Sequence, residues 1–188
     1  MRVIAGQFRS RPLRSLRGLD LRPTADRLRE TLFNILTAGN PEAIAGSTWA
    51  DLYAGTGAVG IEALSRGARK VFFVDSSRNA TELIGENLKS LDVTYGFEMI
   101  QGEVRKNLER WQSQRIAFDY IFLDPPYRLE NEYQKTLEFL AGSNVLTSAS
   151  IVIAEHTNKF DPGEFKGEMK RYRKLLQGDA ALSFYRKH

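Results

Sequence analysis

Cysteine is absent from this chain of 188 residues, and histidine occurs only twice. Without cysteine there is no disulfide, no thiolate nucleophile and no cysteine-based metal site, and two histidines leave little to hold zinc. Long apolar runs are also missing, because the longest uncharged stretch, residues 139–154, is too short and too polar to span a bilayer. Residues 2–9 lack the pattern of a secretory signal. We therefore expect a cytoplasmic protein with no metal and no membrane partner.

Lysine is missing from the first 30 residues, where eight arginines stand against three acidic residues. Residues 166–188 are also basic, whereas the part between is acidic. Basic surfaces bind polyanions by releasing counterions, and arginine is the better of the two basic side chains for phosphate. The charge pattern favours nucleic-acid binding, with solvated termini as the alternative. The candidate phosphate contacts are Arg9, Arg11, Arg14 and Arg17.

Short apolar runs alternate with amphipathic stretches from residue 48 onward. Strands are predicted at 48–53, 70–75, 97–101, 118–123 and 151–155, and helices at 58–66, 78–91, 103–111 and 130–141. This alternation predicts a doubly wound α/β fold, in which helices cover both faces of a mostly parallel sheet. A further helix is expected to open at Pro23. Residues 169–176 and 181–186 predict an antiparallel hairpin that ends the sheet, and residues 2–16 predict a short β-hairpin extension.

A glycine-rich turn follows the first predicted strand. Gly55 and Gly57 allow the backbone to approach a ligand closely, and Gly60 allows the next helix to pack tightly on the sheet. Asp75 ends the next strand, where a carboxylate would accept hydrogen bonds from the ribose hydroxyls of a nucleoside. This order of a strand, a glycine turn, a helix and a second strand with an acidic end predicts a nucleoside site.

The identity of that ligand depends on Asp51, which precedes the glycines at the end of the strand. The glycine spacing also fits a nicotinamide dinucleotide, whose pyrophosphate would sit on the helix N-terminus. A carboxylate at this place disfavours a pyrophosphate and favours a cationic ligand. We therefore expect S-adenosylmethionine, with S-adenosylhomocysteine as its product.

The tetrapeptide at residues 124–127 predicts the chemistry. Two prolines directly after a buried strand make a rigid turn and leave carbonyl groups free to accept hydrogen bonds. Asp124 and the carbonyl of Pro125 could accept the two hydrogens of an exocyclic amine, while Tyr127 offers a face on which a base can stack. Asp124 could also stabilise the positive charge that develops on the amine, or take its proton. We expect these three residues to be catalytic, with a strand-ending turn as the alternative.

The sequence resembles the RsmD family of bacterial 16S ribosomal RNA guanine-N2 methyltransferases nearly from end to end. The segments that carry the resemblance are residues 1–6, 21–34, 51–57, 73–75 and 124–127, and Gly178 with Phe184 and Tyr185. The resemblance implies a Rossmann-like, seven-stranded sheet and a methyl transfer to one guanine N2 in the small-subunit RNA. It also implies that the N-terminal hairpin contacts RNA. We expect two parts in the chain, a basic hairpin extension at 1–22 and a methyltransferase domain at 23–188.

Carried over to this sequence, the family's pattern implies further site residues. Arg22, Thr24 and Arg27 match a stretch at the methionine end of the cofactor and the RNA entrance. Many relatives carry Asp next to Gly after the third strand, where it accepts from the adenine amino group. This chain has Gly102 followed by Glu103, whose longer side chain would have to serve instead. We expect a monomer that acts on an assembled or assembling small ribosomal subunit.

Other functions remain open from the sequence alone. A DNA-adenine or protein-amide N-methyltransferase shares the tetrapeptide logic, usually with Asn in place of Asp124. A nicotinamide-dependent oxidoreductase would need a hydride-handling residue that we do not find, and a non-catalytic RNA-binding assembly factor would need no turnover. His156 is expected to be structural and Trp49 and Trp111 to lie in the core, while Tyr53 could line the cofactor pocket or pack beneath it.

Overall fold

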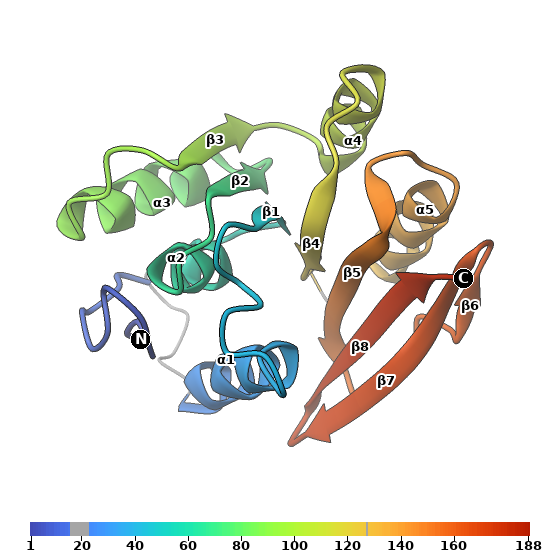
Figure 1. Cartoon of the computed structure of the whole chain (residues 1–188), viewed down its shortest axis with the longest axis horizontal. Coiled ribbons are helices and arrows are strands. Elements are labelled where there is room, and N and C mark those ends of the chain that lie inside the picture. Colours follow the sequence, from blue (N-terminus) through green and yellow to red (C-terminus); the bar gives the residue numbers. More distant parts are fainter. Residues whose placement is uncertain (16–22, 127) are drawn as a thin grey trace.

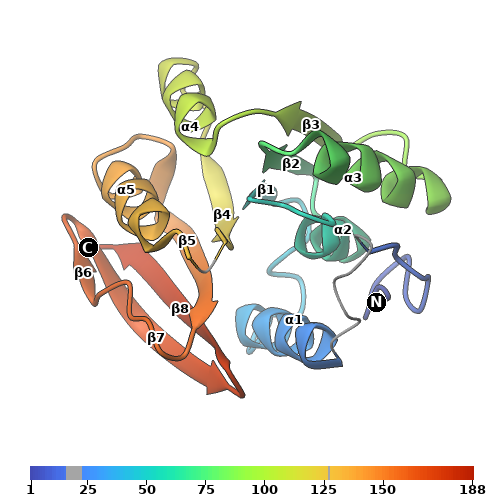
Figure 2. The same cartoon turned by 180° about the vertical axis from the view of Figure 1, so that it is seen from behind.

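One eight-stranded sheet with helices on both faces forms the body of the computed structural model (Figures 1 and 2). The structure describes residues 1–15, 23–126 and 128–188. The strands are β1 Thr48–Leu52, β2 Lys70–Asp75, β3 Phe97–Gln101, β4 Phe118–Leu123, β5 Leu146–Thr157, β6 Phe165–Lys166, β7 Met169–Gln177 and β8 Ala180–Lys187. The helices are α1 Pro23–Leu36, α2 Ala58–Ser65, α3 Arg78–Ser90, α4 Val104–Ser113 and α5 Glu130–Ala141.

The strand order is β3-β2-β1-β4-β5-β8-β7-β6. Strands β1 to β5 pair in parallel, whereas β8, β7 and β6 add to the sheet in antiparallel fashion. The predicted mostly parallel sheet with an antiparallel C-terminal hairpin is therefore confirmed. The sheet has eight strands and not the expected seven, because β6 was not predicted. With only two residues, β6 is too short for a periodicity to be recognised in the sequence.

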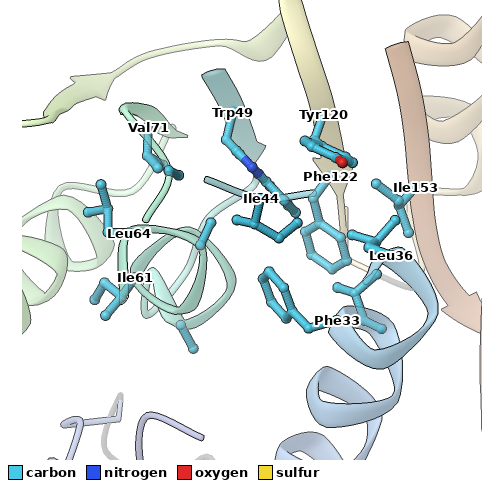
Figure 3. Close-up of a cluster of buried hydrophobic side chains, with 14 of the residues drawn as sticks. Phe33, Leu36, Ile44, Trp49, Ile61, Leu64, Val71, Tyr120, Phe122 and Ile153 are labelled. Carbon is cyan, nitrogen blue, oxygen red and sulfur yellow. The ribbon is translucent and has the colours of Figure 1, made fainter. Parts of the chain in front are cut away.

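Two hydrophobic clusters lie on opposite faces of the sheet. Helices α1, α2 and α3 cover one face, and α4 and α5 cover the other (Figure 1). On the first face Trp49 stacks between Phe33 and Tyr120, with ring centroids 5.4 Å and 4.6 Å away (Figure 3). On the second, Trp111 meets Phe118 edge to face at 4.8 Å. Both tryptophans are fully buried, so their prediction as core residues is confirmed.

Strand β5 begins five residues earlier than its apolar run predicts. Its first part carries Thr, Ser and Ala, and Leu146 pairs with Phe118 before a register shift in the ladder. The hydroxyl of Ser150, which is buried, donates to the carbonyl of Phe118 at 2.6 Å. Because polar side chains satisfied inside the fold give no apolar pattern, the sequence did not reveal this part of the strand.

The N-terminal segment folds back on itself through a single antiparallel bridge between Arg2 and Pro12, instead of a regular hairpin. Its backbone hydrogen bonds include Val3 N–H to the Arg11 carbonyl at 3.0 Å. Residues 1–15, which we call the N-terminal arm, lie beside α2 and α3 (Figure 2). The turn in the arm passes so close to α2 that a Cβ on Gly6 would lie 1.9 Å from the carbonyl oxygen of Ser65.

In the described part of the chain, no helix combines the length and the apolar character needed to cross a bilayer.

Candidate active site

Four acidic residues stand on one face of the sheet, near the carboxyl ends of four parallel strands. Two positions before each acid stands a buried apolar residue, which belongs to the core between the sheet and helices α1, α2 and α3. The pairs are Trp49 and Asp51, Phe73 and Asp75, Phe122 and Asp124, and Ile153 and Glu155. Because side chains alternate along a strand, each acid faces the same side as the apolar residue two positions before it. The alternation therefore gathers the four carboxyl groups along one edge of the sheet.

The strand order reverses between β1 and β4, since the chain runs outward to β3 and then returns to the other side of β1. In open α/β sheets such a reversal leaves a crevice at the carboxyl ends of the strands, where ligands bind. Asp51 near the end of β1 and Asp124 just after β4 flank this crevice.

The turn between β1 and α2 is held by two backbone-to-carboxylate hydrogen bonds. The N–H of Gly55 donates to Asp75 at 2.9 Å, and the N–H of Gly60 donates to Asp51 at 2.8 Å. Gly55 and Gly57 have φ angles of 54° and 74°, in the left-handed region that glycine adopts most readily. The two acids of β1 and β2 thus fix the shape of the turn that connects the strands to α2.

Gly60 provides the close helix–strand packing that its position in the sequence predicts. A Cβ at this position would lie 2.3 Å from an edge atom of the Phe73 ring. The helix α2 can therefore lie directly on β2 only because residue 60 has no side chain.

A cavity of about 740 Å³ opens at this edge of the sheet. Its walls come from the N-terminal arm, from α1, from the turn after β1, and from the ends of β4 and β5 with the start of β8. The lining residues with chemistry to offer are Arg29, Asp51, Tyr53, Asp124 and Glu155, and the glycine turn contributes Gly55. A volume of this size suits a small organic ligand.

Three of the cavity's carboxyl groups titrate well above their usual range. Burial raises the pKa of Asp51 to about 7 and that of Glu155 to about 7. Burial also raises the pKa of Asp124 well above its ordinary value, and the nearby charges of Glu155 and Asp51 raise it further. The guanidinium of Arg29 acts in the opposite direction on Glu155. A pocket with this excess of buried acid is one that a cationic ligand would stabilise.

In the part of the chain that the structure describes, no group of three or more His, Asp or Glu residues is arranged to hold a metal ion.

The turn after β4 is tied to α5 and β5. The N–H of Asp124 approaches the carbonyl of Leu52 at 3.4 Å, which continues the ladder between β4 and β1. The hydroxyl of Tyr133, which is buried on α5, donates to the carbonyl of Glu155 at 2.7 Å and lies 3.2 Å from the carbonyl of Pro125. Pro125 is buried, whereas Asp124 is half-buried at the cavity wall. Tyr127 lies outside the described residues.

Arg29 is a site residue that the sequence analysis missed. It is almost fully buried on α1 and donates to the carbonyl of Arg2, at 2.5 Å, and to Asp26, at 3.0 Å. One face of α1 is apolar, and Arg29 lies within that face. Because arginine is usually exposed, it looks like a surface residue in the sequence. A signal was available, because Arg29 precedes Leu32 by three positions and Leu36 by seven, which places it on the buried side of the helix.

Glu155 was also missed as a site residue, since the sequence analysis considered only its neighbour His156. Side-chain alternation sends the two residues to opposite faces of the sheet. His156 is fully buried, bonded to the hydroxyl of Ser183 at 2.9 Å and to the carbonyl of Thr157 at 2.8 Å, and burial lowers its pKa. His156 is therefore a structural residue, as expected, and the acid beside it faces the cavity.

Tyr53, which the sequence left undecided, lines the cavity. Its φ angle of 61° is unusual for a non-glycine residue and lies within the turn that carries Gly55. Its hydroxyl is 3.3 Å from Glu132 and 3.2 Å from Thr136 on α5, and burial raises its pKa to about 12. The side chain therefore joins the turn to α5 as a neutral hydrogen-bonding group.

Four predicted cofactor residues are not among those that line this cavity, namely Gly57, Asp75, Glu103 and Arg27. The carboxylate of Glu103, at the start of α4, pairs with Lys106 at 2.8 Å and is well exposed. Arg27 is exposed on α1, and the side chain of Thr24 falls outside the described part of the structure. Their roles in cofactor binding stay predictions.

The predicted RNA-binding arginines of the arm differ in their surroundings. Arg14 pairs with Glu86 on α3 at 2.8 Å, and Arg11 binds the carbonyl of Ser90 and lies 3.8 Å from Asp92. Arg9 is exposed, and no residue of the described ranges forms an ion pair with it. Arg17 and Arg22 lie outside the described residues. Of the described three, Arg9 is the one whose charge is free for a polyanion.

Comparison with known proteins gives concordant matches over the whole chain. A family model described as Conserved hypothetical protein 95 matches residues 1–186. The Ribosomal RNA small subunit methyltransferase D of Haemophilus influenzae is 33% identical over 86% of this chain and 81% of its own length. The Bacillus subtilis protein YlbH is 33% identical over 100% of this chain and 99% of its own length. The solved structure of yhhF from Escherichia coli superposes with a TM-score of 0.82 at 28% identity, covering 100% of this chain and 98% of that one.

Proposed function

Because the chain belongs to the family described as Conserved hypothetical protein 95, the RsmD family, we propose that it transfers a methyl group from S-adenosylmethionine to ribosomal RNA. The acceptor that we propose is the exocyclic N2 amine of one guanine in the 16S RNA. The observation that carries the proposal is the meeting of Asp51, Asp124 and Glu155 in one cavity at the switch point of the sheet. A cavity of that charge suits a cationic methyl donor and an amine that becomes cationic.

The residues around the first two strands fit the donor. Asp51 would face its cationic methionine end, Gly55 and Gly57 would let the backbone pass beside it, and Asp75 would accept from the ribose hydroxyls. Asp75 already accepts N–H groups from Gly55 and Ser77, so it stands oriented at the turn. When bound, S-adenosylmethionine supplies an electrophilic methyl group.

The turn after β4 fits the acceptor. Asp124 and the carbonyl of Pro125 would take the two amine hydrogens and aim the nitrogen lone pair at the methyl carbon. A carbonyl oxygen has two lone pairs, so Pro125 can accept from the amine as well as from Tyr133. The amine would become cationic as it takes the methyl group and the donor leaves as S-adenosylhomocysteine, and a neighbouring carboxylate would stabilise the charge and receive the proton. Tyr127 would stack on the base.

The N-terminal part of the chain would contact the RNA away from the reacting base. We propose that residues 1–22 contact RNA outside the pocket, that the substrate is an assembled or assembling small subunit, and that a monomer acts in the cytoplasm. The target base must leave its stack to reach a cavity at the sheet edge, so a loop or single-stranded position is expected.

Methyl transfer from labelled S-adenosylmethionine tests the proposal. Small subunits from cells lacking the protein, naked 16S RNA, DNA and a mixture of ribosomal proteins are offered in parallel, and the labelled product is digested and identified by mass. N2-methylguanosine at one position of the small-subunit RNA is the expected result. Label in protein, in DNA or on another base would overturn the proposal, as would binding of a nicotinamide dinucleotide in place of S-adenosylmethionine in calorimetry.

A further inference from the structure

Glu155 and Asp124 stand side by side at the ends of two neighbouring parallel strands. Leu123 of β4 is in register with Ala154 of β5, and each acid is the next residue along its strand. Neighbouring strands lie about 4.8 Å apart, and residues in register point to the same face. Both acids also line the same cavity.

The spacing of the two acids is fixed by α5. The Tyr133 hydroxyl donates to the carbonyl of Glu155 in β5 at 2.7 Å, and the carbonyl of Pro125 in the diproline turn lies 3.2 Å from the same oxygen. The end of β5 therefore cannot drift away from the diproline turn. Two carboxyl groups presented at this spacing by rigid strands form a preorganised pair, which is what recognition of a small planar group requires.

Arg29 makes Glu155 easier to ionise than Asp124. The charged groups that face Glu155 are Asp124 from β4, Asp51 from β1 and Arg29 from α1. Burial raises the pKa of both acids, but Arg29 opposes the rise at Glu155, whose pKa is about 7, whereas the charges of Glu155 and Asp51 raise the pKa of Asp124 further. An ionised carboxylate is an acceptor only, with no hydrogen to donate.

The Watson–Crick edge of guanine presents two adjacent donors, the N1–H and the N2 amine. Adenine presents an amine beside an unprotonated N1, which is an acceptor. A group that can only accept, placed beside the site of the amine, therefore discriminates between the two bases. It would accept the N1–H of guanine, whereas in adenine the unprotonated N1 would face it as a second acceptor.

We propose that Glu155 accepts the N1–H of the target guanine while Asp124 and the Pro125 carbonyl hold its N2 amine. Glu155 is then a specificity-determining residue for the acceptor base. This inference rests on the proposed function, since it assumes that guanine enters the cavity, and it adds which side chain selects it.

The first test is the variant Glu155→Gln. The expected result is that kcat/KM for small subunits falls roughly 10- to 100-fold, because one specific base contact is lost, while the Kd for S-adenosylmethionine changes less than about threefold. Glu138→Gln is the matched control, because Glu138 is exposed on α5 and is not among the residues that line the cavity. An unchanged kcat/KM in Glu155→Gln would overturn the inference.

The second test replaces the target guanine by 2-aminopurine, which keeps the 2-amine but has an unprotonated N1. The modified base is ligated into the small-subunit RNA at the mapped position, and the subunit is reconstituted. The wild-type protein should prefer guanine at least tenfold. Glu155→Gln should lose most of that preference, since a glutamine amide can donate to N1.

These outcomes separate the inference from the proposed function. If the wild-type protein methylates 2-aminopurine as well as guanine, the role of Glu155 is wrong although the methyltransferase assignment stands. If the wild-type protein methylates neither base, the proposed function itself fails. The wild-type comparison needs no variant, so it remains decisive even if Glu155→Gln does not fold.

Discussion

The guanidinium of Arg29 on α1 lies 3.8 Å from the carboxylate of Glu62 on α2, and both side chains are buried. Glu62 also accepts the N–H groups of Ile4 and Ala5, at 2.7 Å and 3.0 Å. This pair therefore joins the two helices to the N-terminal arm, which forms one wall of the cavity. The arm keeps its place through charge in the interior, in addition to apolar contacts.

Glu62→Gln is expected to destabilise the protein by about 3–5 kcal/mol, because it leaves Arg29 and Arg66 without their shared buried partner. Chemical denaturation measures the free energy of unfolding. Glu82→Gln is the control, since Glu82 forms an equivalent i,i+4 pair with Arg78 on the exposed side of α3. That change should cost less than about 0.5 kcal/mol. Equal effects of the two variants would contradict the role given to the buried pair.

Gly60→Ala should cost about 1–3 kcal/mol, since its Cβ would overlap the ring of Phe73 and push α2 away from β2. The matched control is Gly142→Ala, because the Cβ built at residue 142 has no neighbour within 4 Å among the described residues. Urea unfolding of both variants gives the comparison. If Gly60→Ala were as stable as Gly142→Ala, the packing argument would be wrong.

Asp124→Asn should reduce kcat for methyl transfer by roughly 10²- to 10⁴-fold, because the amide cannot take the proton or stabilise the cationic amine as a carboxylate does. Binding of S-adenosylmethionine, measured by calorimetry, should remain. Asp179→Asn, an exposed change in the turn between β7 and β8, serves as control. A variant that keeps normal turnover would remove Asp124 from the reaction.

The affinity for S-adenosylmethionine should rise with pH through about 7. Asp51, which faces the cationic end of the donor in the proposed complex, has a pKa of about 7 in the free cavity, so below that pH it is protonated and offers no charge to a cation. Between pH 6 and pH 8 its ionisation can contribute up to roughly tenfold. S-adenosylhomocysteine, which lacks the sulfonium charge, should show a smaller dependence, and calorimetry at both pH values compares the ligands. Identical pH dependence for the two would count against a carboxylate-lined sulfonium site.

The raised pKa values of Asp51 and Glu155 predict that the free protein loses stability as pH rises from about 5 to about 7. Their pKa values are higher folded than unfolded, so the folded state binds more protons within that window. The stabilisation is complete at pH values below the unfolded pKa and is lost as pH passes the folded one. Thermal unfolding across this range measures the slope, and Asp51→Asn should reduce it.

Arg9→Ala should weaken binding to small-subunit RNA and lower the slope of log K against log salt concentration by about one. Arg14→Ala should have less effect, because Glu86 already neutralises part of that charge. Filter binding at several salt concentrations distinguishes the two. The reverse order would show that the exposed arginine of the arm does not contact phosphate.

Much of the fold was predictable because strand and helix periods differ. The runs that became β2, β3 and β4 have the predicted bounds, since they are apolar, short and followed by a turn or a helix. The first part of β5 and the whole of β6 were not predicted. The former satisfies its polar side chains internally, and the latter is a strand of two residues that pairs with β7 and bonds α5 through Lys166 and Gln134.

The sequence by itself determined which local chemistry is available: a glycine turn after one strand, an acid at the end of the next, and Asp124 with two prolines after a fourth. Each depends on neighbours in the chain, so local pattern was enough to find it. Only the tertiary structure decided that Arg29 lines the cavity with Glu155, and that Glu155 stands beside Asp124. Those relations join residues through strand register and helix packing, and neither can be read from one segment of chain.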